Sequence, residues 1–199
     1  MERKKETRNS LEHIEIRSIE EDANNNTVTL EGYIAKFNSP TTIWQGYNEQ
    51  LDPHCFDNTL ADGHNIFLLY AHDWTKPMAC TQNKTLALNI DENGLHFIAT
   101  VDTSISYVYD TVTLIKAGIT AGCSFGFYIL NDNETFDASN NTYTDTILEV
   151  QLLEGSILCN PQYEDTTVSA RGKDRIEEIE RSKKLEIEKE KILIELELN

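Results

Sequence analysis

The fold is decided by the stretch Thr27-Val28-Thr29-Leu30-Glu31-Gly32-Tyr33-Ile34-Ala35-Lys36-Phe37. Apolar residues recur at every second position through Val28, Leu30 and Ile34, and β-branched and aromatic residues fill much of the remainder. This period of two is typical of a β-strand with one buried face. We therefore expect a β-rich core that begins at this stretch.

Further strands are predicted on the C-terminal side of this stretch. The run Ile66-Phe67-Leu68-Leu69-Tyr70 is continuously apolar and of strand length, as in a strand buried on both faces, and His72 follows at its end. Residues 85–90 and 95–101 flank Asp91-Glu92-Asn93-Gly94, whose composition favours the turn of a β-hairpin. Residues 147–154 predict another strand.

Helices and loops are predicted between these strands. Residues 104–117 place apolar side chains three and four positions apart, which predicts an amphipathic helix that ends at Gly118. Residues 56–62 are typical of a short helix before Gly63. Residues 44–56 and the Asn- and Asp-rich residues 131–145 have the composition of loops.

The length of 199 residues predicts one domain with an appendage. We expect a charged, mobile lead-in over residues 1–23, the folded domain over residues 24–171, and a charged tail over residues 172–199. Glutamate and lysine throughout the tail favour a helix that docks on a partner or on another copy, although the alternation near residues 192–198 is also compatible with a strand.

Composition excludes several classes of protein. With 39% hydrophobic and 26% charged residues the chain is globular, and its net charge of −17 without a basic patch argues against a nucleic-acid partner. The longest apolar stretch, residues 66–71, is far shorter than the roughly 20 residues of a membrane span. Four separated cysteines and the absence of an apolar signal sequence indicate a reducing compartment.

Cofactor and metal chemistry have no support in the motifs. The cysteines and histidines show neither CxxC nor HExxH spacing, and GxGxxG and GxxxxGK[ST] are both absent. The GxSxG elbow of α/β-hydrolases is also missing. We expect no metal and no cofactor.

A serine-based site is the remaining chemical candidate. Ser124 lies in Gly122-Cys123-Ser124-Phe125-Gly126, where small residues leave room around its hydroxyl group. A serine nucleophile needs an imidazole to accept its proton and a third group to orient that imidazole, and His72 and Glu149 would supply them. Taken alone, the spacing favours hydrogen-bonded polar side chains at strand ends over a catalytic set, because a chain with five histidines and many serines always contains some such trio.

Five stretches, taken together and in order, resemble the HK97-type prohead (capsid maturation) serine proteases of tailed bacteriophages, a family related in fold to the herpesvirus assemblins. They are Gly32-Tyr33-Ile34-Ala35-Lys36-Phe37-Asn38-Ser39, Leu51-Asp52-Pro53 with Phe56-Asp57-Asn58-Thr59-Leu60, Leu69-Tyr70-Ala71-His72-Asp73, Gly122-Cys123-Ser124-Phe125-Gly126-Phe127, and Glu149-Val150-Gln151-Leu152-Leu153-Glu154-Gly155-Ser156 with Pro161. The resemblance covers about residues 28–170.

The resemblance implies a β-rich α+β fold with an assemblin-like closed β-barrel core flanked by helices. It also implies that His72 is the general base and Ser124 the nucleophile. For the third residue we favour Glu149, which lies 25 residues after Ser124, a spacing similar to that in assemblins. Glu154 also matches an acidic position of the family and is the alternative. The two glutamates lie five residues apart, so on one strand they would point to opposite faces.

The implied function is that of a serine endopeptidase inside the immature capsid (the prohead), in the cytoplasm of the bacterial host. Its partners would be the major capsid protein, from which it removes the scaffolding segment, and its own chain, which it cleaves and with which it would form a homo-oligomer. No Lys or Arg lies between Glu149 and Ala170, so backbone N–H groups near Ser124 or after Glu154 are expected to hold the oxyanion.

Two other functions are compatible with parts of the sequence. One is a catalytically inactive scaffolding or assembly protein on the same fold, although retention of His72 and Ser124 argues against it. The other is a β-rich binding module, which would account for the acidic composition but not for five ordered motifs.

Overall fold

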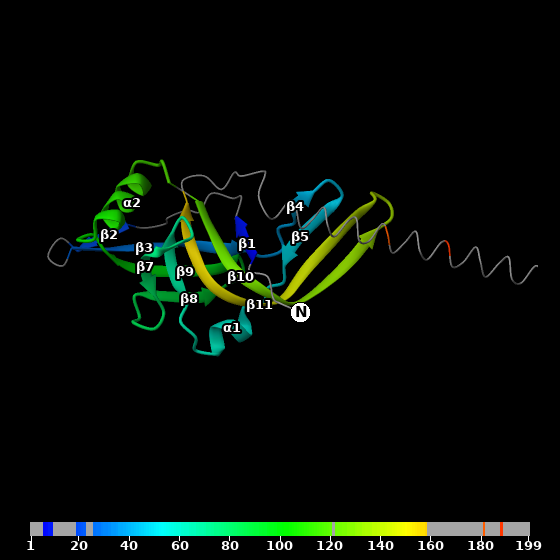
Figure 1. Cartoon of the computed structure of the whole chain (residues 1–199), viewed down its shortest axis with the longest axis horizontal. Helices are drawn as coiled ribbons and strands as arrows, with labels where there is room; N and C mark the ends of the chain where they lie inside the picture. Colours follow the sequence, from blue (N-terminus) through cyan, green and yellow to red (C-terminus); the bar gives the residue numbers. More distant parts are fainter. Residues whose placement is uncertain are drawn as a thin grey trace, which may run out of the picture.

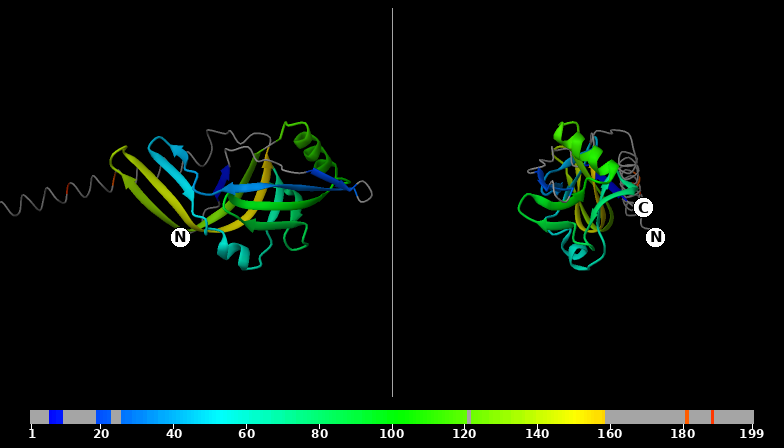
Figure 2. Two further views of the ribbon diagram at one scale, coloured as in Figure 1. Left: turned by 180° about the vertical axis from the view of Figure 1, so that it is seen from behind. Right: turned by 90° about the vertical axis from the view of Figure 1, so that its left-hand side faces the viewer.

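The computed structural model describes residues 6–9, 19–22, 26–120 and 122–158, together with the single positions Arg181 and Glu188. These residues form two β-sheets and two helices, so the β-rich character expected from the sequence is confirmed (Figure 1). The helices α1 (Asp57–Ala61) and α2 (Ser106–Lys116) lie on opposite sides of the strands (Figure 2).

The smaller sheet contains the stretch that decides the fold. Its strand order is β2-β3-β9-β8, and all of its neighbours are antiparallel. The strands are β2 (Ile19–Asp22), β3 (Thr27–Lys36), β9 (Gly94–Asp102) and β8 (Leu86–Ile90). The predicted strand over residues 27–37 and the predicted hairpin of residues 85–101 are both confirmed.

The larger sheet is built around one long hairpin. Its strands are β1 (Glu6–Asn9), β10 (Gly122–Asp137), β11 (Thr142–Leu158), β5 (Tyr47–Leu51), β4 (Thr41–Trp44), β6 (Phe67–Tyr70) and β7 (Asp73–Cys80). β10 and β11 pair along almost their entire lengths. On its other edge, β11 pairs in parallel with β5 near one end and with β6 near the other.

The expected closed barrel is wrong. Among the described residues, the end strands of a sheet do not pair with each other: β1 and β4 end the main path of the larger sheet, and β2 and β8 end the smaller sheet. Neither sheet therefore closes. The physical reason lies in the hairpin of β10 and β11, whose pairing register shifts between Gly126 and Phe127 and twice more between Ile129 and Asp132. Bulges of this kind bend a ribbon, and the far half of the hairpin extends with β4 and β5 away from the smaller sheet (Figure 1).

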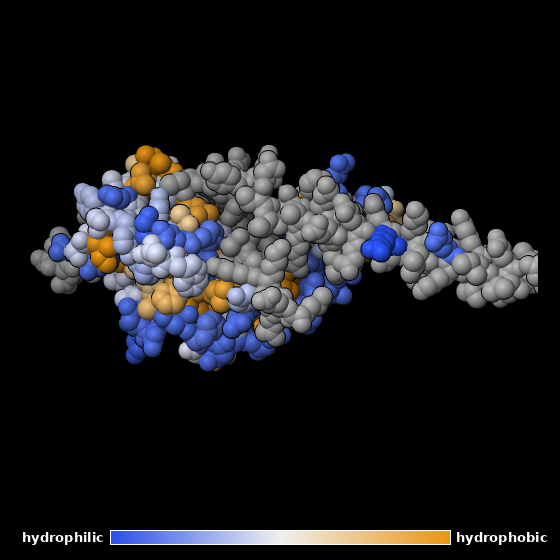
Figure 3. All heavy atoms as spheres, in the orientation of Figure 1, coloured by the Kyte–Doolittle hydropathy of each residue, from blue (hydrophilic) through white to orange (hydrophobic). Residues whose placement is uncertain are grey.

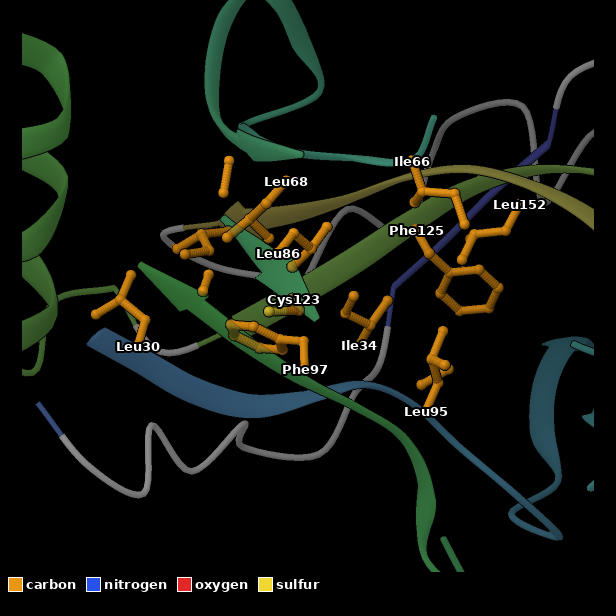
Figure 4. Packing of buried hydrophobic residues seen from close by; sticks show 14 of the residues in the cluster. Leu30, Ile34, Ile66, Leu68, Leu86, Leu95, Phe97, Cys123, Phe125 and Leu152 are labelled. Carbon is orange, nitrogen blue, oxygen red and sulfur yellow. The ribbon is translucent and has the colours of Figure 1, made fainter. Parts of the chain in front are cut away.

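The hydrophobic core fills the space between the two sheets. Cys123 and Phe125 of β10 point into the same region as Ile34 of β3 and Phe97 of β9 (Figure 4). The rings of Phe125 and Phe127 stack at 4.8 Å, which shows that these two side chains share one face of β10. The opposite face of the strand is therefore available to Ser124, which alternates with them.

The two predicted helices are confirmed, with Gly118 and Gly63 at positive φ directly beyond them. The two predicted loops are wrong in large part. Residues 131–137 and 142–145 belong to the far half of β10 and β11, and β4 and β5 occupy much of residues 41–51. The polar side chains of 131–137 reflect a ribbon that is mostly exposed to solvent, and backbone pairing does not depend on apolar composition.

The N-terminal region contributes two short strands to the sheets. Within residues 1–23, which we expected to form a charged, mobile lead-in, β1 pairs with β10 and β2 pairs with β3. The tail of residues 172–199 lies outside the described residues apart from Arg181 and Glu188, so the domain boundaries at 24 and 171 stay a prediction.

The visible surface of the described residues is mostly hydrophilic, with small separate hydrophobic areas (Figure 3). In the part of the chain that the structure describes, no helix has the length and apolar composition needed to cross a membrane.

Candidate active site

His72 is placed by a tight turn between β6 and β7. Tyr70 pairs with Asp73, so Ala71 and His72 are the two turn residues, and their φ angles are +51° and +58°. Positive φ is uncommon for residues other than glycine and costs about 1–3 kcal/mol when the surrounding structure imposes it. Here the backbone N–H of Ala71 donates to the Ile157 carbonyl at 3.0 Å, and that of His72 donates to Ser156 Oγ at 3.0 Å.

Ser124 is the third residue of β10 and is fully buried. Its cross-strand neighbour on β11 is Ser156, and Gly126 pairs with Glu154. Side chains alternate along a strand, so Gly122, Ser124 and Gly126 share one face. β10 itself therefore places no bulky side chain beside the hydroxyl group of Ser124 on this face.

Glu154 lies on the same side of the sheet and is also fully buried. Its Oε1 atom is 2.7 Å from His72 Nδ1, and its Oε2 atom accepts a hydrogen bond from Ser156 Oγ at 2.7 Å. A buried carboxylate is unfavourable unless its oxygens have partners. Both oxygens of Glu154 have one.

The imidazole of His72 connects the serine and the carboxylate. Ser124 Oγ lies 2.8 Å from His72 Nε2, on the opposite side of the ring from Glu154. A carboxylate only accepts hydrogen bonds, so the Nδ1–H group donates to Glu154 and leaves Nε2 to accept the proton of Ser124. This is the arrangement of nucleophile, base and orienting acid that serine catalysis requires.

The structure places Glu154, the alternative third residue, beside His72, and it places the favoured Glu149 elsewhere. Glu149 pairs with Asn131 beyond the first register shift and accepts a hydrogen bond from Asn58 Nδ2 at 2.8 Å. It therefore belongs to the contact between α1 and β11. The number of residues between Ser124 and Glu149 does not reveal which part of β11 lies beside Ser124 when the hairpin folds back. In the structure that part is residues 154–156.

Ser156 is a residue of this site that the sequence reasoning did not identify. It is fully buried, accepts a hydrogen bond from the His72 backbone and donates one to Glu154. The one available signal was its position two residues after Glu154, which places both on the same face of a strand. Its approach to His72 depends on the parallel pairing of β11 with β6.

Cys123 is next to Ser124 but is not suited to act as the nucleophile. Burial raises the pKa of the Cys123 thiol well above its ordinary range, and the negative charge of Glu154 raises it further. The thiolate is the reactive form of cysteine, so this side chain is inert at neutral pH. Its neighbours in Figure 4 show that it is part of the core.

His64 lies beside the strand that carries Glu154. Its Nδ1 atom is 2.5 Å from Asp62 Oδ1 and its Nε2 atom is 2.6 Å from the Leu152 carbonyl. Burial lowers the pKa of His64, but its hydrogen bonds to Asp62 and Leu152 outweigh this effect and raise the pKa above its ordinary value. Both partners only accept, so the ring donates from both nitrogens when it is protonated and then joins the end of α1 to β11.

A serine, an imidazole and a buried carboxylate joined by hydrogen bonds on a β-rich framework form the arrangement of a serine hydrolase. The family model of the caudovirus prohead serine proteases matches residues 12–182, and the chain belongs to this family. No curated protein and no solved structure matches the chain.

Membership makes the chain a serine peptidase of phage capsid maturation. Proteases of this family act inside the procapsid within the host and interact with the phage capsid protein. The resemblance seen in the five sequence stretches is thereby confirmed.

Proposed function

We propose that the chain is a serine endopeptidase in which Ser124 is the nucleophile, His72 the general base and Glu154 the orienting acid. Its substrates are the scaffolding segment of the major capsid protein and its own chain. The observation that carries the proposal is the pair of short contacts that His72 makes, with Ser124 Oγ at 2.8 Å and with Glu154 Oε1 at 2.7 Å.

The reaction uses these contacts in two stages. In the first, His72 Nε2 accepts the proton of Ser124 while Oγ forms a bond to the carbonyl carbon of the substrate. The imidazolium then donates that proton to the leaving amine, the peptide bond breaks, and an acyl-enzyme remains. In the second, His72 takes a proton from water, the hydroxide attacks the ester, and the proton returns to Ser124 as the acid leaves.

Glu154 acts through its charge and its position. Its negative charge stabilises the imidazolium that forms in each stage, and its contact with Nδ1 holds the ring in the tautomer that leaves Nε2 free to accept a proton. The hydrogen bond from Ser156 Oγ fixes the second carboxylate oxygen. Because the carboxylate is buried, its interaction with the imidazolium is less screened than at a surface.

The test is co-expression of the chain with the capsid protein of the same phage, followed by intact-mass measurement of both proteins. The wild type should remove a discrete segment from the capsid protein, whereas Ser124→Ala should leave it whole. Loss of one hydroxyl group should change the melting temperature of Ser124→Ala little. Ser139→Ala removes an exposed serine hydroxyl in the far half of the hairpin and is the matched control, which should cut like the wild type.

Two results would contradict the proposal. Cleavage by Ser124→Ala would exclude this serine as the nucleophile. Unchanged masses with the wild type, in the presence of assembled shells, would favour the inactive scaffolding protein. The complete set of contacts around His72 argues against that alternative.

A further inference from the structure

One edge of the nucleophile strand is occupied by the chain's own N-terminal strand. β10 pairs with β11 on one edge, and on the other edge its residues 124–127 pair with β1. The pairing is antiparallel and places Asn9 directly opposite Ser124 and Thr7 opposite Gly126. Figure 1 shows the two strands β1 and β10 side by side. Within the described residues, β1 ends the sheet on this side.

A strand edge of this kind is a binding surface for an extended peptide. Its unpaired N–H and C=O groups recruit another strand, and the backbone hydrogen bonds provide affinity whatever the sequence of the added peptide. Opposite residues of an antiparallel pair lie about 4.5–5.5 Å apart at their Cα atoms. A peptide at this edge therefore has its backbone close to Ser124.

We propose that the edge of β10 at residues 124–127 is the docking surface for the extended peptide substrate, and that β1 occupies this surface as an internal competitor. The inference rests on the proposed protease function. A capsid-protein segment would add to the sheet as an antiparallel strand in place of residues 6–9.

The shape of the edge fits this role. Cross-strand partners point to the same face of a sheet, so the docked residues opposite Ser124 and Gly126 lie on the face of the hydroxyl group. Gly126 has no side chain. The substrate residue opposite Gly126, which is two positions along from the residue opposite Ser124, therefore has space for its own side chain. The His72 side chain is 26% exposed, whereas Ser124 is fully buried in the structure that includes β1.

Competition follows because β1 and the substrate need the same backbone groups of β10. A site that is free for only a fraction of the time shows an apparent affinity reduced by that fraction. The expected consequence is a raised KM with no change in kcat, since β1 must leave before the peptide docks but is absent from the docked complex.

The test weakens β1 in the full-length chain. Successive N–H groups of a strand point to opposite edges, so in the double variant Thr7→Pro/Arg8→Pro one of the two prolines removes a donor that faces β10. The control Thr7→Val/Arg8→Thr keeps both N–H groups and strand-forming side chains. Peptide cleavage should show a KM about three- to tenfold lower in the proline variant and unchanged kcat, with wild-type values in the control.

Two further measurements identify the cause. Hydrogen exchange of the backbone amides at residues 124–127, measured with Ser124→Ala to prevent self-cleavage, should be faster when the two prolines are added. A synthetic peptide of residues 1–12 should inhibit the proline variant competitively, because it restores the missing strand from solution.

The outcomes separate this inference from the function on which it rests. If the wild type and the proline variant cut with the same KM and show the same exchange, β1 is not a competitor and the inference is overturned while the protease function stands. If neither cuts the capsid protein or a derived peptide, the protease function fails and the substrate edge fails with it.

Discussion

At the scale of single residues, Glu154 is the group that links His72 to Ser156 by hydrogen bonds. It is fully buried, and its two oxygens are held by His72 and by Ser156. Ser156 in turn accepts the backbone N–H of His72, so three residues form a closed set of hydrogen bonds. Each bond fixes the orientation of the imidazole relative to Ser124.

Replacing Glu154 should be far more damaging than replacing Glu149. Glu154→Gln keeps the size of the side chain but removes the charge that stabilises the imidazolium, so we expect kcat to fall by about 10⁴-fold, as when the acid of a triad is neutralised. Glu149→Gln is the matched control and should keep near wild-type kcat, because its carboxylate contacts Asn58. Steady-state cleavage of a capsid-derived peptide measures both, and the opposite ranking would return the role to Glu149.

Ser156→Ala should show a smaller loss that is confined to kcat. The variant deprives Glu154 of a donor and the His72 backbone of an acceptor. A hydrogen bond to a charged group contributes about 1.5–3 kcal/mol, which corresponds to a loss of about 10- to 150-fold.

We expect KM to stay unchanged in this variant, and Ser156→Thr, which keeps the hydroxyl group, to retain more activity than Ser156→Ala. An equal loss in both variants, or a rise in KM alone, would show that Ser156 fills space and does not position His72.

At the scale of elements, the site depends on where β6 and β10 meet β11. The parallel pairing of β6 with residues 154–157 brings the turn that carries His72 to Glu154 and Ser156. The antiparallel pairing with β10 brings Ser124 opposite Ser156. One segment of β11 thus sets the relative positions of Ser124 and His72.

Gly155 is the point at which this segment packs against the smaller sheet. A Cβ atom at this position would lie 2.6 Å from Ile34 Cδ1 and 3.0 Å from its Cγ1 atom. Gly155→Ala should therefore lower the free energy of unfolding by about 1–3 kcal/mol through overpacking, and reduce kcat by displacing Glu154 and Ser156.

Ile34→Val removes the atom in closest contact and should recover part of both losses in the double variant. Denaturant unfolding of the two single variants and the double variant measures this coupling. Strictly additive effects would show that Ile34 is not the cause of the constraint.

At the scale of the whole molecule, the two sheets enclose one core, while α1 is joined to β11 by polar contacts. Thr59 Oγ1 accepts a hydrogen bond from the Leu152 backbone, and His64 bridges Asp62 to the Leu152 carbonyl. These contacts attach the segment that precedes β6 to the strand that carries Glu154. Their strength should depend on pH, because His64 must be protonated to donate from both ring nitrogens.

Stability should decrease as the pH rises above the ordinary pKa of histidine, about 6.5. The folded chain raises the pKa of His64. At pH values between the unfolded-state pKa and the raised folded-state pKa, the folded state therefore binds more protons than the unfolded state. The stabilisation is complete below about pH 6.5 and is lost as the pH rises through the folded-state pKa.

Melting temperatures between pH 6 and 9 should fall less steeply for His64→Gln and for Asp62→Asn than for the wild type. A wild-type slope retained in both variants would assign the pH dependence to other groups.

Local patterns were enough to predict the local elements, and the resemblance to the prohead proteases pointed to His72 and Ser124. Each of these two residues lies in a short motif of that resemblance, and their catalytic roles stay a prediction. Alternation in residues 27–37, the turn at 91–94 and the helical spacing of 104–117 are local patterns, and their elements form as predicted. Local preferences of this kind are visible without knowledge of the fold.

How these elements meet is visible only in the tertiary structure. Glu154 and not Glu149 lies beside His72, residues 131–137 and 142–145 form paired strands, neither sheet closes into a barrel, and β1 lies beside Ser124. Each of these outcomes depends on the register between strands that are distant in sequence. Register is set by bulges and by the packing of both sheets, and a shift of one residue turns every side chain to the other face.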